Sequence, residues 1–288
     1  MDYSVKTDSV NRFTGSDDYV VSDELMYATN IAIALQKPLL LKGEPGTGKT
    51  MLAHAIAKST GKKLYVWSVK STTKASEGLY IYDTVQRLYD SQFGEGDVGD
   101  IRKYIKLGRL GETFLSDEQV ILLIDEIDKA DLEFPNDLLW ELDQMEYYIP
   151  ETKETVKAKH RPIVVITSNA EKELPDAFLR RCIFHYIEFP SPEIMTDIVA
   201  VHFPDLEEKL LRSAMERFYW IRSLKDIQKK PSTSELLDWL QALVISGISV
   251  EKLKTEIPYM GVLLKKNQDI AELFRAKEIE SRRFDVRR

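Results

Sequence analysis

The octet from Gly43 to Thr50, GEPGTGKT, constrains this chain more than any other feature because it spells a complete phosphate-binding loop. An apolar run at 38–41 precedes it, and a helical pattern at 51–57 follows it. This strand–loop–helix context separates a functional loop from a glycine-rich turn that binds nothing. The glycines let backbone N–H groups close around a phosphate at the N-terminus of the following helix. The octet therefore predicts a nucleotide site.

Two side chains of the octet carry specific chemistry. Lys49 is placed to reach the β- and γ-phosphates, and the Thr50 hydroxyl suits a Mg²⁺ ion. ATP and Mg²⁺ are therefore the expected cofactors, with Thr50 and Asp125 as the metal ligands. GTP is not expected, because the chain has no Asn-Lys-x-Asp motif that reads the base. The residues expected to bind the nucleotide are Gly43, Glu44, Pro45, Gly46, Thr47, Gly48, Lys49, Thr50, Met51 and Asp125.

Composition excludes several classes of protein. The chain has 288 residues and a formal net charge of −7, which disfavours a wholesale nucleic-acid binder but leaves room for a local basic channel. No apolar run approaches the length that spans a bilayer, and the polar start is no signal peptide. The single cysteine, Cys182, cannot form an internal disulfide. These features predict a cytoplasmic protein without membrane insertion.

Five apolar runs alternate with helical patterns along the first two thirds of the chain, which predicts an α/β fold with a parallel sheet covered on both faces. The runs are 38–41, 63–69, 120–124, 162–167 and 183–189. After residue 190 the pattern becomes helical. We expect a loosely held N-terminal arm at 1–18, an α/β nucleotide-binding domain at 19–190, a smaller all-α lid domain at 191–275 and a charged, frayed tail at 276–288.

Acidic and amide side chains follow two of the apolar runs. Asp125 and Glu126 end the run at 120–124, as in a Walker B motif, so Asp125 is expected to hold the Mg²⁺ shell and Glu126 to activate the attacking water. A kinase would transfer the phosphoryl group to a substrate hydroxyl, whereas a second acid, Glu126, is suited to activating water for hydrolysis. Asn169 follows the run at 162–167, where an amide can contact both the γ-phosphate and the water.

Two adjacent arginines, Arg180 and Arg181, come just before the fifth apolar run. Arginines at the end of a helix often only interact with its dipole and nearby acids. In this order of motifs, however, the sharper hypothesis is an arginine finger that enters the ATP site of a neighbouring subunit. Arg181 is the preferred finger and Arg180 the alternative, with the other residue supporting the interface.

These motifs, in this order, resemble the AAA+ ATPase superfamily from about residue 19 to about residue 274. Within it the chain looks most like the MoxR branch, a relative of the dynein-type AAA modules. The motifs that carry this resemblance are Gly43–Thr50, the DEIDKA segment 125–130, a hairpin at 145–156 before the Asn169 strand, and LPDAFLRR at 174–181. The polar stretch 70–115 falls where that branch inserts a β-hairpin into its second helix.

The resemblance implies a ring, expected to be a homo-hexamer, with ATP between subunits and loops that face a central pore. Segments 70–74 and 147–156 are the pore-side candidates. A chaperone-like role is implied, often with a client that carries a von Willebrand factor A domain.

One departure is clear: Ser234 or a neighbour stands where the family places a sensor 2 arginine. Either Lys229 or Lys230 replaces that arginine, or lid closure is coupled less tightly to the nucleotide.

The leading interpretation is therefore a Mg²⁺-dependent ATPase that remodels or activates a partner protein. A nucleotide-gated assembly switch with slow turnover is the alternative, which the missing sensor 2 arginine makes credible. A nucleic-acid motor is less favoured because of the net acidity, and a small-molecule kinase less still.

Overall fold

The computed structural model describes residues 12–94, 98–169 and 171–285. The chain divides into two compact units. The first contains residues up to 43 and residues 48–187, and the second contains residues 44–47 and everything from residue 188 onward. The main division therefore falls within a few residues of the expected boundary at 190. Residues 44–47, the middle of the phosphate-binding loop, are therefore counted in the second unit.

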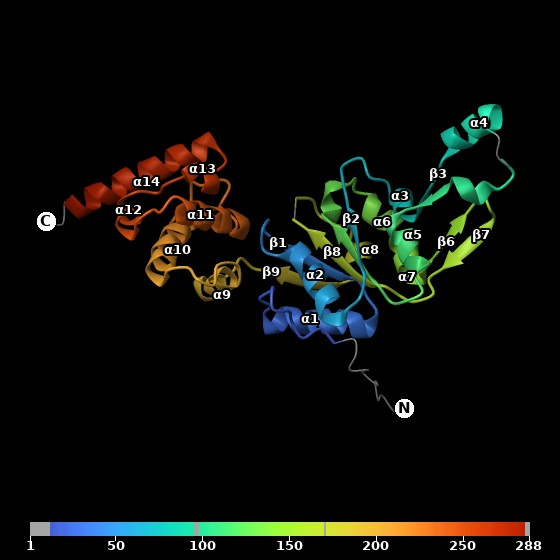
Figure 1. The fold of residues 1–288 in the computed structure, drawn as a ribbon, viewed down its shortest axis with the longest axis horizontal. Helices are drawn as coiled ribbons and strands as arrows, with labels where there is room; N and C mark the ends of the chain where they lie inside the picture. The colour runs from blue at the N-terminus through green and yellow to red at the C-terminus, as the bar shows by residue number, and fades with distance from the viewer. Residues whose placement is uncertain (1–11, 95–97, 170, 286–288) are drawn as a thin grey trace, which may run out of the picture. The chain divides into compact units, whose positions relative to one another are not determined.

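The first unit is built around a sheet of five parallel strands in the order β2-β5-β8-β1-β9 (Figure 1). The predicted α/β fold with a five-stranded parallel sheet is confirmed. Neighbouring strands pair in register, with Leu39 of β1 opposite Val165 of β8 and Ile124 of β5 opposite Ile166 of β8. The strands are β1 (Leu39–Gly43), β2 (Leu64–Ser68), β5 (Ile121–Asp125), β8 (Ile163–Ser168) and β9 (Ile183–Ile187).

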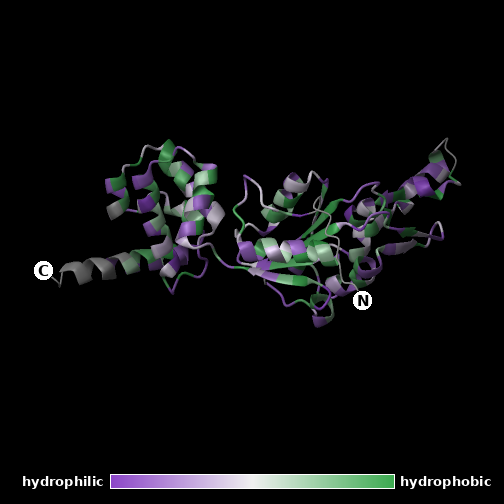
Figure 2. Cartoon of the chain, turned by 90° about the horizontal axis from the view of Figure 1, so that it is seen from below, coloured by the Kyte–Doolittle hydropathy of each residue, from purple (hydrophilic) through white to green (hydrophobic). Residues whose placement is uncertain are grey.

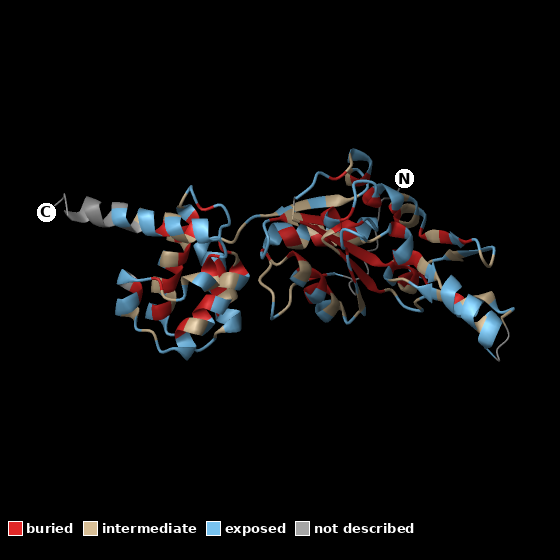
Figure 3. Cartoon of the chain, turned by 90° about the horizontal axis from the view of Figure 1, so that it is seen from above, coloured by how far each residue is buried: buried red, intermediate tan, exposed pale blue. Residues whose placement is uncertain are grey.

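Helices cover both faces of this sheet, which is why its strands read as continuous apolar runs. Successive side chains of a strand point to opposite faces. Ile121 and Leu123 of β5 accordingly join one buried cluster, whereas Leu122 and Ile124 join another. Figure 3 shows the central strands β5, β8 and β1 as the most continuously buried part of the unit, and Figure 2 shows the middle of the sheet as strongly hydrophobic.

The first buried cluster packs under α1 (Asp23–Leu35) and α2 (Lys49–Thr60). Ser22 begins α1, because its side chain accepts a hydrogen bond from the backbone N–H of Leu25. Gly61 ends α2 in the left-handed conformation, at φ 65°. The second cluster packs under α3 (Ala75–Leu79), α5 (Arg109–Phe114), η3 (Ile127–Lys129), α6 (Phe134–Asp137), α7 (Leu139–Gln144) and α8 (Asp176–Leu179).

An insert interrupts the connection between α3 and α5. It consists of an antiparallel ribbon, β3 (Tyr80–Tyr82) and β4 (Ile105–Leu107), which carries α4 (Thr84–Phe93) and η2 (Ile101–Tyr104). The expected β-hairpin is present and bears an additional helix. A second hairpin, β6 (Glu146–Ile149) with β7 (Glu154–Lys157), lies at the same end of the unit (Figure 1). An ion pair between Arg102 and Glu154 joins the two.

The second unit contains a helical bundle with its own core, as the sequence predicts. Trp239 is fully buried in it, and its indole N–H donates to the Pro258 carbonyl at 2.7 Å. None of the helices in the described ranges combines the length and apolar character needed to cross a membrane. The helices are α9 (Pro192–His202), α10 (Glu208–Ser223), α11 (Thr233–Ile245), α12 (Val250–Thr255), α13 (Met260–Leu263) and α14 (Asn267–Asp285).

The two ends of the chain differ from the expectation. Residues 1–11 lie outside the described residues, but Phe13 is fully buried in the first unit, so the described part of the arm is not loosely held. Asn30 of α1 clamps it, because its side chain accepts from Phe13 N at 2.8 Å and donates to Phe13 O at 2.9 Å. At the other end, α14 continues to Asp285, so a tail starting at residue 276 would begin inside a helix.

Candidate active site

The phosphate-binding loop joins the end of β1 to the start of α2. Gly48, the residue before α2, has φ 84°, a conformation that side chains other than glycine rarely adopt. A Cβ atom there would also come within 3.2 Å of the Tyr19 ring. Lys49 is buried, and its Nζ donates to the Gly43 carbonyl at 2.9 Å. The lysine therefore lies folded over the loop where the phosphates of a nucleotide are expected.

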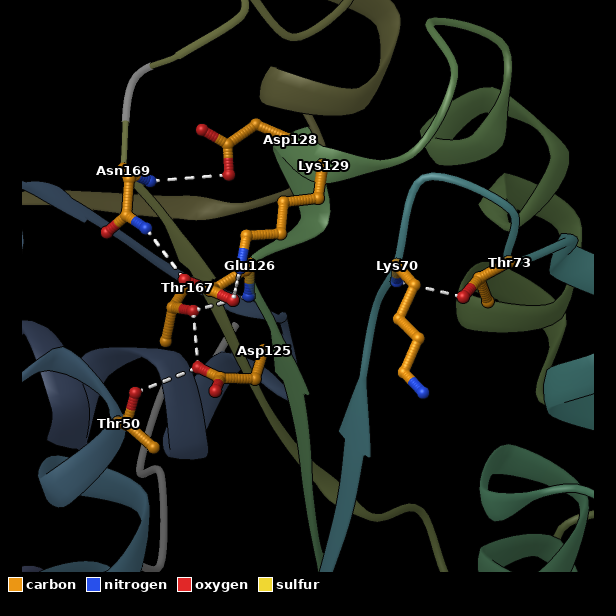
Figure 4. Close-up of polar contacts among 9 residues, drawn as sticks. All are labelled: Thr50, Lys70, Thr73, Asp125, Glu126, Asp128, Lys129, Thr167 and Asn169. Atoms are coloured by element: carbon orange, nitrogen blue, oxygen red, sulfur yellow. Dashed lines mark hydrogen bonds and ion pairs between the residues drawn. The ribbon is translucent and has the colours of Figure 1, made fainter.

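Thr50 and Asp125, the two predicted metal ligands, are in direct contact at the carboxyl end of β5. The Thr50 hydroxyl donates to Asp125 Oδ1 at 2.8 Å (Figure 4). Asp125 is the last residue of β5, and Thr50 lies in the first turn of α2. A hydroxyl and a carboxylate at this spacing are hard oxygen donors of the kind that Mg²⁺ uses beside substrate phosphates. The pair therefore fits a magnesium ion.

Thr167, which the sequence did not single out, ties the two Walker B residues together. Its buried hydroxyl donates to Asp125 Oδ1 at 2.7 Å and accepts from the Glu126 backbone N–H at 2.8 Å. The strand register explains this position, since Ile124 opposite Ile166 places the next residue of β5 beside the next residue of β8. The signal available in the sequence was a hydroxyl residue at the end of the apolar run 162–167.

Glu126 and Asn169, the predicted base and its partner, are in direct contact. Asn169 Nδ2 donates to Glu126 Oε1 at 2.9 Å, and the Lys129 ammonium pairs with Glu126 Oε2 (Figure 4). Glu126 also adopts a left-handed backbone conformation, at φ 58°, which is uncommon for a residue other than glycine and recurs at functional sites. Both carboxylate oxygens therefore have a partner.

Asp128 fixes the loop that carries Asn169. Its side chain is almost fully buried and accepts from the backbone N–H of Asn169 at 3.3 Å and of Glu171 at 2.9 Å. A buried carboxylate that is bonded by backbone N–H groups is a rigid support. Asp128 and Lys129 belong to the DEIDKA segment, although the sequence assigned neither of them a role.

A cleft of about 520 Å³ opens beside Glu126 at the ends of β2 and β5. The segment 70–74, a predicted pore-side loop, forms part of its wall. A tight turn shapes this loop, because Thr73 Oγ1 accepts from Lys70 N at 2.9 Å and Thr73 N donates to Lys70 O at 3.0 Å (Figure 4). The cleft is lined by Ser68, Val69, Lys70, Ser71, Glu126, Lys129, Glu171 and Lys172.

The two candidate finger arginines have different environments. Arg181 pairs with Asp143 at the end of α7 and also donates to the Ala177 carbonyl. Arg161 also binds the end of α7, because it donates to the backbone carbonyls of Asp143 and Leu142. Arg180 is exposed, and its guanidinium has no ion-pair or hydrogen-bond partner among the described residues. Arg181 is thus engaged within its own subunit, and Arg180 is not.

In the second unit, an arginine that the sequence did not single out contacts Glu44. Arg222 of α10 is buried, donates to Glu44 Oε2 at 2.8 Å and to the Pro231 carbonyl at 2.5 Å, and stacks over the Phe189 ring. Lys229, proposed to replace the sensor 2 arginine, instead lies 3.7 Å from Glu235. The sequence could have indicated Arg222, because a cation there falls on the apolar face of the α10 helix.

Four of the residues that the sequence predicted therefore come together at one edge of the sheet: Thr50, Asp125, Glu126 and Asn169. Met51, also predicted to contact the nucleotide, is half exposed on α2 and stays a prediction. A hydroxyl–carboxylate pair beside a phosphate-binding loop and a carboxylate–amide pair one residue further on can together bind a metal–triphosphate and activate water.

Comparison with known proteins agrees with this chemistry. Residues 39–191, more than half of the chain, match the model of the ATPase family associated with various cellular activities (AAA). A midasin of Giardia intestinalis is 33% identical over 95 residues, which cover 32% of this chain and 2% of that protein. The RuvB subunit of the Holliday junction branch migration complex of Chlamydia felis is 37% identical over 76 residues.

The second match covers 26% of this chain and 20% of the Chlamydia protein, so the chain spans only a small part of either relative. The RuvB subunit of Chlamydia abortus gives a match of the same length and identity. These partial matches leave the partners of the chain open. With the family model spanning the whole parallel sheet, this chain belongs to the AAA family of ATPases.

Proposed function

We propose that this chain binds and hydrolyses Mg·ATP and uses the reaction to remodel or activate a partner protein. The observation that carries this proposal is one continuous hydrogen-bonded array across three elements. Thr50 of α2 bonds Asp125 of β5, and Thr167 of β8 bonds both Asp125 and the backbone of Glu126. An array that fixes Asp125 and the backbone of Glu126 relative to the phosphate-binding loop supports hydrolysis over nucleotide storage alone.

Each residue then has a distinct role. Lys49 and the loop N–H groups bind the β- and γ-phosphates, and Thr50 with Asp125 holds Mg²⁺, whose charge offsets that of the phosphates. Glu126 accepts the proton of the attacking water. Asn169 bonds Glu126, so it would orient the carboxylate and, through it, the attacking water.

We further propose a homo-oligomeric ring, with a hexamer as the expected state, in which one arginine of each subunit enters the next subunit's site. AAA ATPases typically form such assemblies, and this chain offers two candidates. Arg181, the residue that the sequence favoured, would first have to leave Asp143. Arg180 is exposed and has no such partner among the described residues, which supports Arg180 as the finger and Arg181 as its anchor.

The client is proposed to be a protein, and the MoxR-like pattern suggests one with a von Willebrand factor A domain. The insert that carries α4 supports protein contact, because α4 has no buried residue yet exposes four large apolar side chains on one side. A cytoplasmic location is part of the same proposal. The exposed side chains are Val85, Leu88, Tyr89 and Phe93.

A second candidate is a nucleotide-gated assembly switch with slow turnover. One observation favours it: both oxygens of Glu126 are already bonded, to Asn169 and Lys129. A nucleic-acid motor is a weaker candidate, because the net charge of −7 disfavours binding to a polyanion. The similarity to RuvB covers only 76 residues and does not by itself support that role.

Steady-state ATPase measurement of the full chain with Mg²⁺ tests the proposal, with Glu126→Gln as the variant. We expect wild-type turnover that the variant loses while it still binds ATP, as measured with a fluorescent ATP analogue. Wild-type protein that binds ATP but turns over as slowly as the variant would instead establish the switch. Stimulation by DNA would favour the motor. Absence of ATP binding would refute all three.

A further inference from the structure

We propose that a patch of three lysines on the second unit binds the outer face of α9 in a second copy of this chain. The contact joins two different surfaces, so it repeats head to tail and can close a ring. The inference rests on the ring proposed above and gives it a contact in addition to the candidate finger arginines. The lysine patch consists of Lys230, Lys265 and Lys266.

Two segments that are far apart in the sequence come together to form the lysine patch. Asp269, in the first turn of α14, is fully buried and accepts from the backbone N–H groups of Gln228 at 2.9 Å and Lys229 at 3.2 Å. Lys266 Nζ also donates to Gln228 Oε1 at 3.2 Å. Like charges repel, so these hydrogen bonds to a buried carboxylate are what hold the two lysine segments together. The fold therefore builds the patch.

The lysine patch presents unpaired positive charge at the surface. Its three lysines are exposed, and none of them forms an ion pair with an acid in the part of the chain that the structure describes. The neighbouring Lys229 already has Glu235 at 3.7 Å, and Asp269 lies beneath the surface. A surface of this charge is complementary to an acidic one, which steers two partners together and fixes their register.

The outer face of α9 has the complementary charge. Glu193 and Asp197 lie one helical turn apart on it, and both are exposed. Ile194 and Val201, which are 39% and 40% exposed, lie at helix spacing beside them, while the buried residues of α9 lie on its other side. Residues 188–208 include six acids and no lysine or arginine. This face therefore offers both negative charge and apolar area to a partner.

The two surfaces do not neutralise each other within one copy. Figure 1 shows α9 at one edge of the helical bundle and α13, which ends just before Lys265, at the opposite edge. Neither Glu193 nor Asp197 forms an ion pair with a lysine or arginine among the described residues. A second copy brings the missing surface for each of them, which is why it is the partner that we propose.

The experiment reverses each surface in turn and measures assembly by sedimentation velocity with Mg·ATP. The parent is the full chain with Glu126→Gln, so that ATP stays bound. We expect Lys265→Glu with Lys266→Glu, and separately Glu193→Lys with Asp197→Lys, to weaken assembly about tenfold or more, because like charges then face each other. Assembly of the parent should weaken as salt is raised. Neither lysine is a candidate for the ATP site.

Mixing the two reversed chains gives the sharpest result. One chain then has two acidic surfaces and the other has two basic surfaces, so every contact in an alternating ring is attractive again. We expect the mixture to regain assembly, in rings with an even number of subunits. Lys62→Glu with Lys63→Glu, in the first unit, changes the net charge of the chain as much as the lysine reversal does and is the matched control. It should assemble like the parent.

Unchanged assembly in either reversed chain would overturn the inference, as would a mixture that stays dissociated while both chains keep their melting temperatures. An equal loss in the control would also overturn it, since net charge alone would then be the cause. If the lysine reversal abolishes binding to a duplex oligonucleotide but leaves assembly intact, the patch serves nucleic acid instead. A parent chain that stays monomeric with Mg·ATP at every salt concentration would refute the ring itself.

Discussion

Arg181 and Asp143, 38 residues apart in sequence, form an ion pair that ties the turn before β9 to the end of α7. The β6–β7 hairpin begins just after α7, so this pair connects the candidate finger turn to a candidate client-facing hairpin. Arg161 also stabilises the end of α7, because it donates to two backbone carbonyls there. Arg180, next in sequence, lies outside this network.

We therefore expect Arg180→Ala to lower ATPase activity about 10³-fold or more while ATP binding is retained, because a finger stabilises transition-state charge and not the bound ground state. Arg181→Ala should have a smaller effect. The measurement is steady-state turnover, with ATP affinity measured separately.

Mixing two inactive variants provides the control for action between subunits. A Glu126→Gln subunit keeps its own arginine, and an Arg180→Ala subunit keeps its own Glu126. A mixture should therefore recover part of the lost activity at their shared interfaces. If the mixture stays inactive while both variants still assemble with each other, Arg180 does not act in a neighbouring site.

Thr167 gives a second prediction, since its hydroxyl bonds both Asp125 and the Glu126 backbone. Thr167→Val keeps the shape and removes both bonds, which leaves the neighbouring polar groups poorly aligned. We expect kcat to fall about 10- to 100-fold with a small change in ATP affinity. Thr167→Ser retains the hydroxyl and should stay near the wild-type rate. Equal losses in the two variants would show that a hydroxyl at this position is not sufficient, which would contradict the role given to its two bonds.

These residues also show how far the sequence reaches. The strands and the residues Thr50, Asp125 and Glu126 are local signals, because the strands are apolar runs and the three residues belong to motifs that directly follow two of these runs. The structure brings Asn169 to Glu126, because parallel strands end at the same edge. What these residues do in catalysis stays a prediction.

Other contacts depend on information that no short segment contains. The role of Thr167 follows from the register between β5 and β8, and the Lys129 pair follows from a left-handed residue that is not glycine. Phe13 lies in a polar segment, and its burial depends on Asn30, 17 residues away. Pairing between distant segments decides the first and the third, and an unusual local backbone conformation decides the second.

The insert leads to a prediction about stability. Leu88 on α4 is 59% exposed, whereas Leu110 on α5 is fully buried. Leu110→Ala should lower the free energy of unfolding by about 2–5 kcal/mol, because it leaves a cavity. Leu88→Ala should change it by less than about 0.5 kcal/mol, because the side chain is already in water. Urea denaturation measures both. A large loss for Leu88→Ala would mean that α4 packs against another part of the protein or a second copy.

Cys182 provides the last prediction, on reactivity. Burial raises the pKa of its thiol to about 12, and the nearby Asp143 carboxylate acts in the same direction. The thiolate is the reactive form, so at pH 8 the folded protein should react with a thiol reagent roughly a thousandfold more slowly than the unfolded chain, whose cysteine titrates near pH 8.5. Labelling in buffer and in concentrated urea measures the ratio. Asp143→Asn should quicken native labelling slightly, because it removes the unfavourable carboxylate, and rapid labelling of the native wild type would contradict the burial of this thiol.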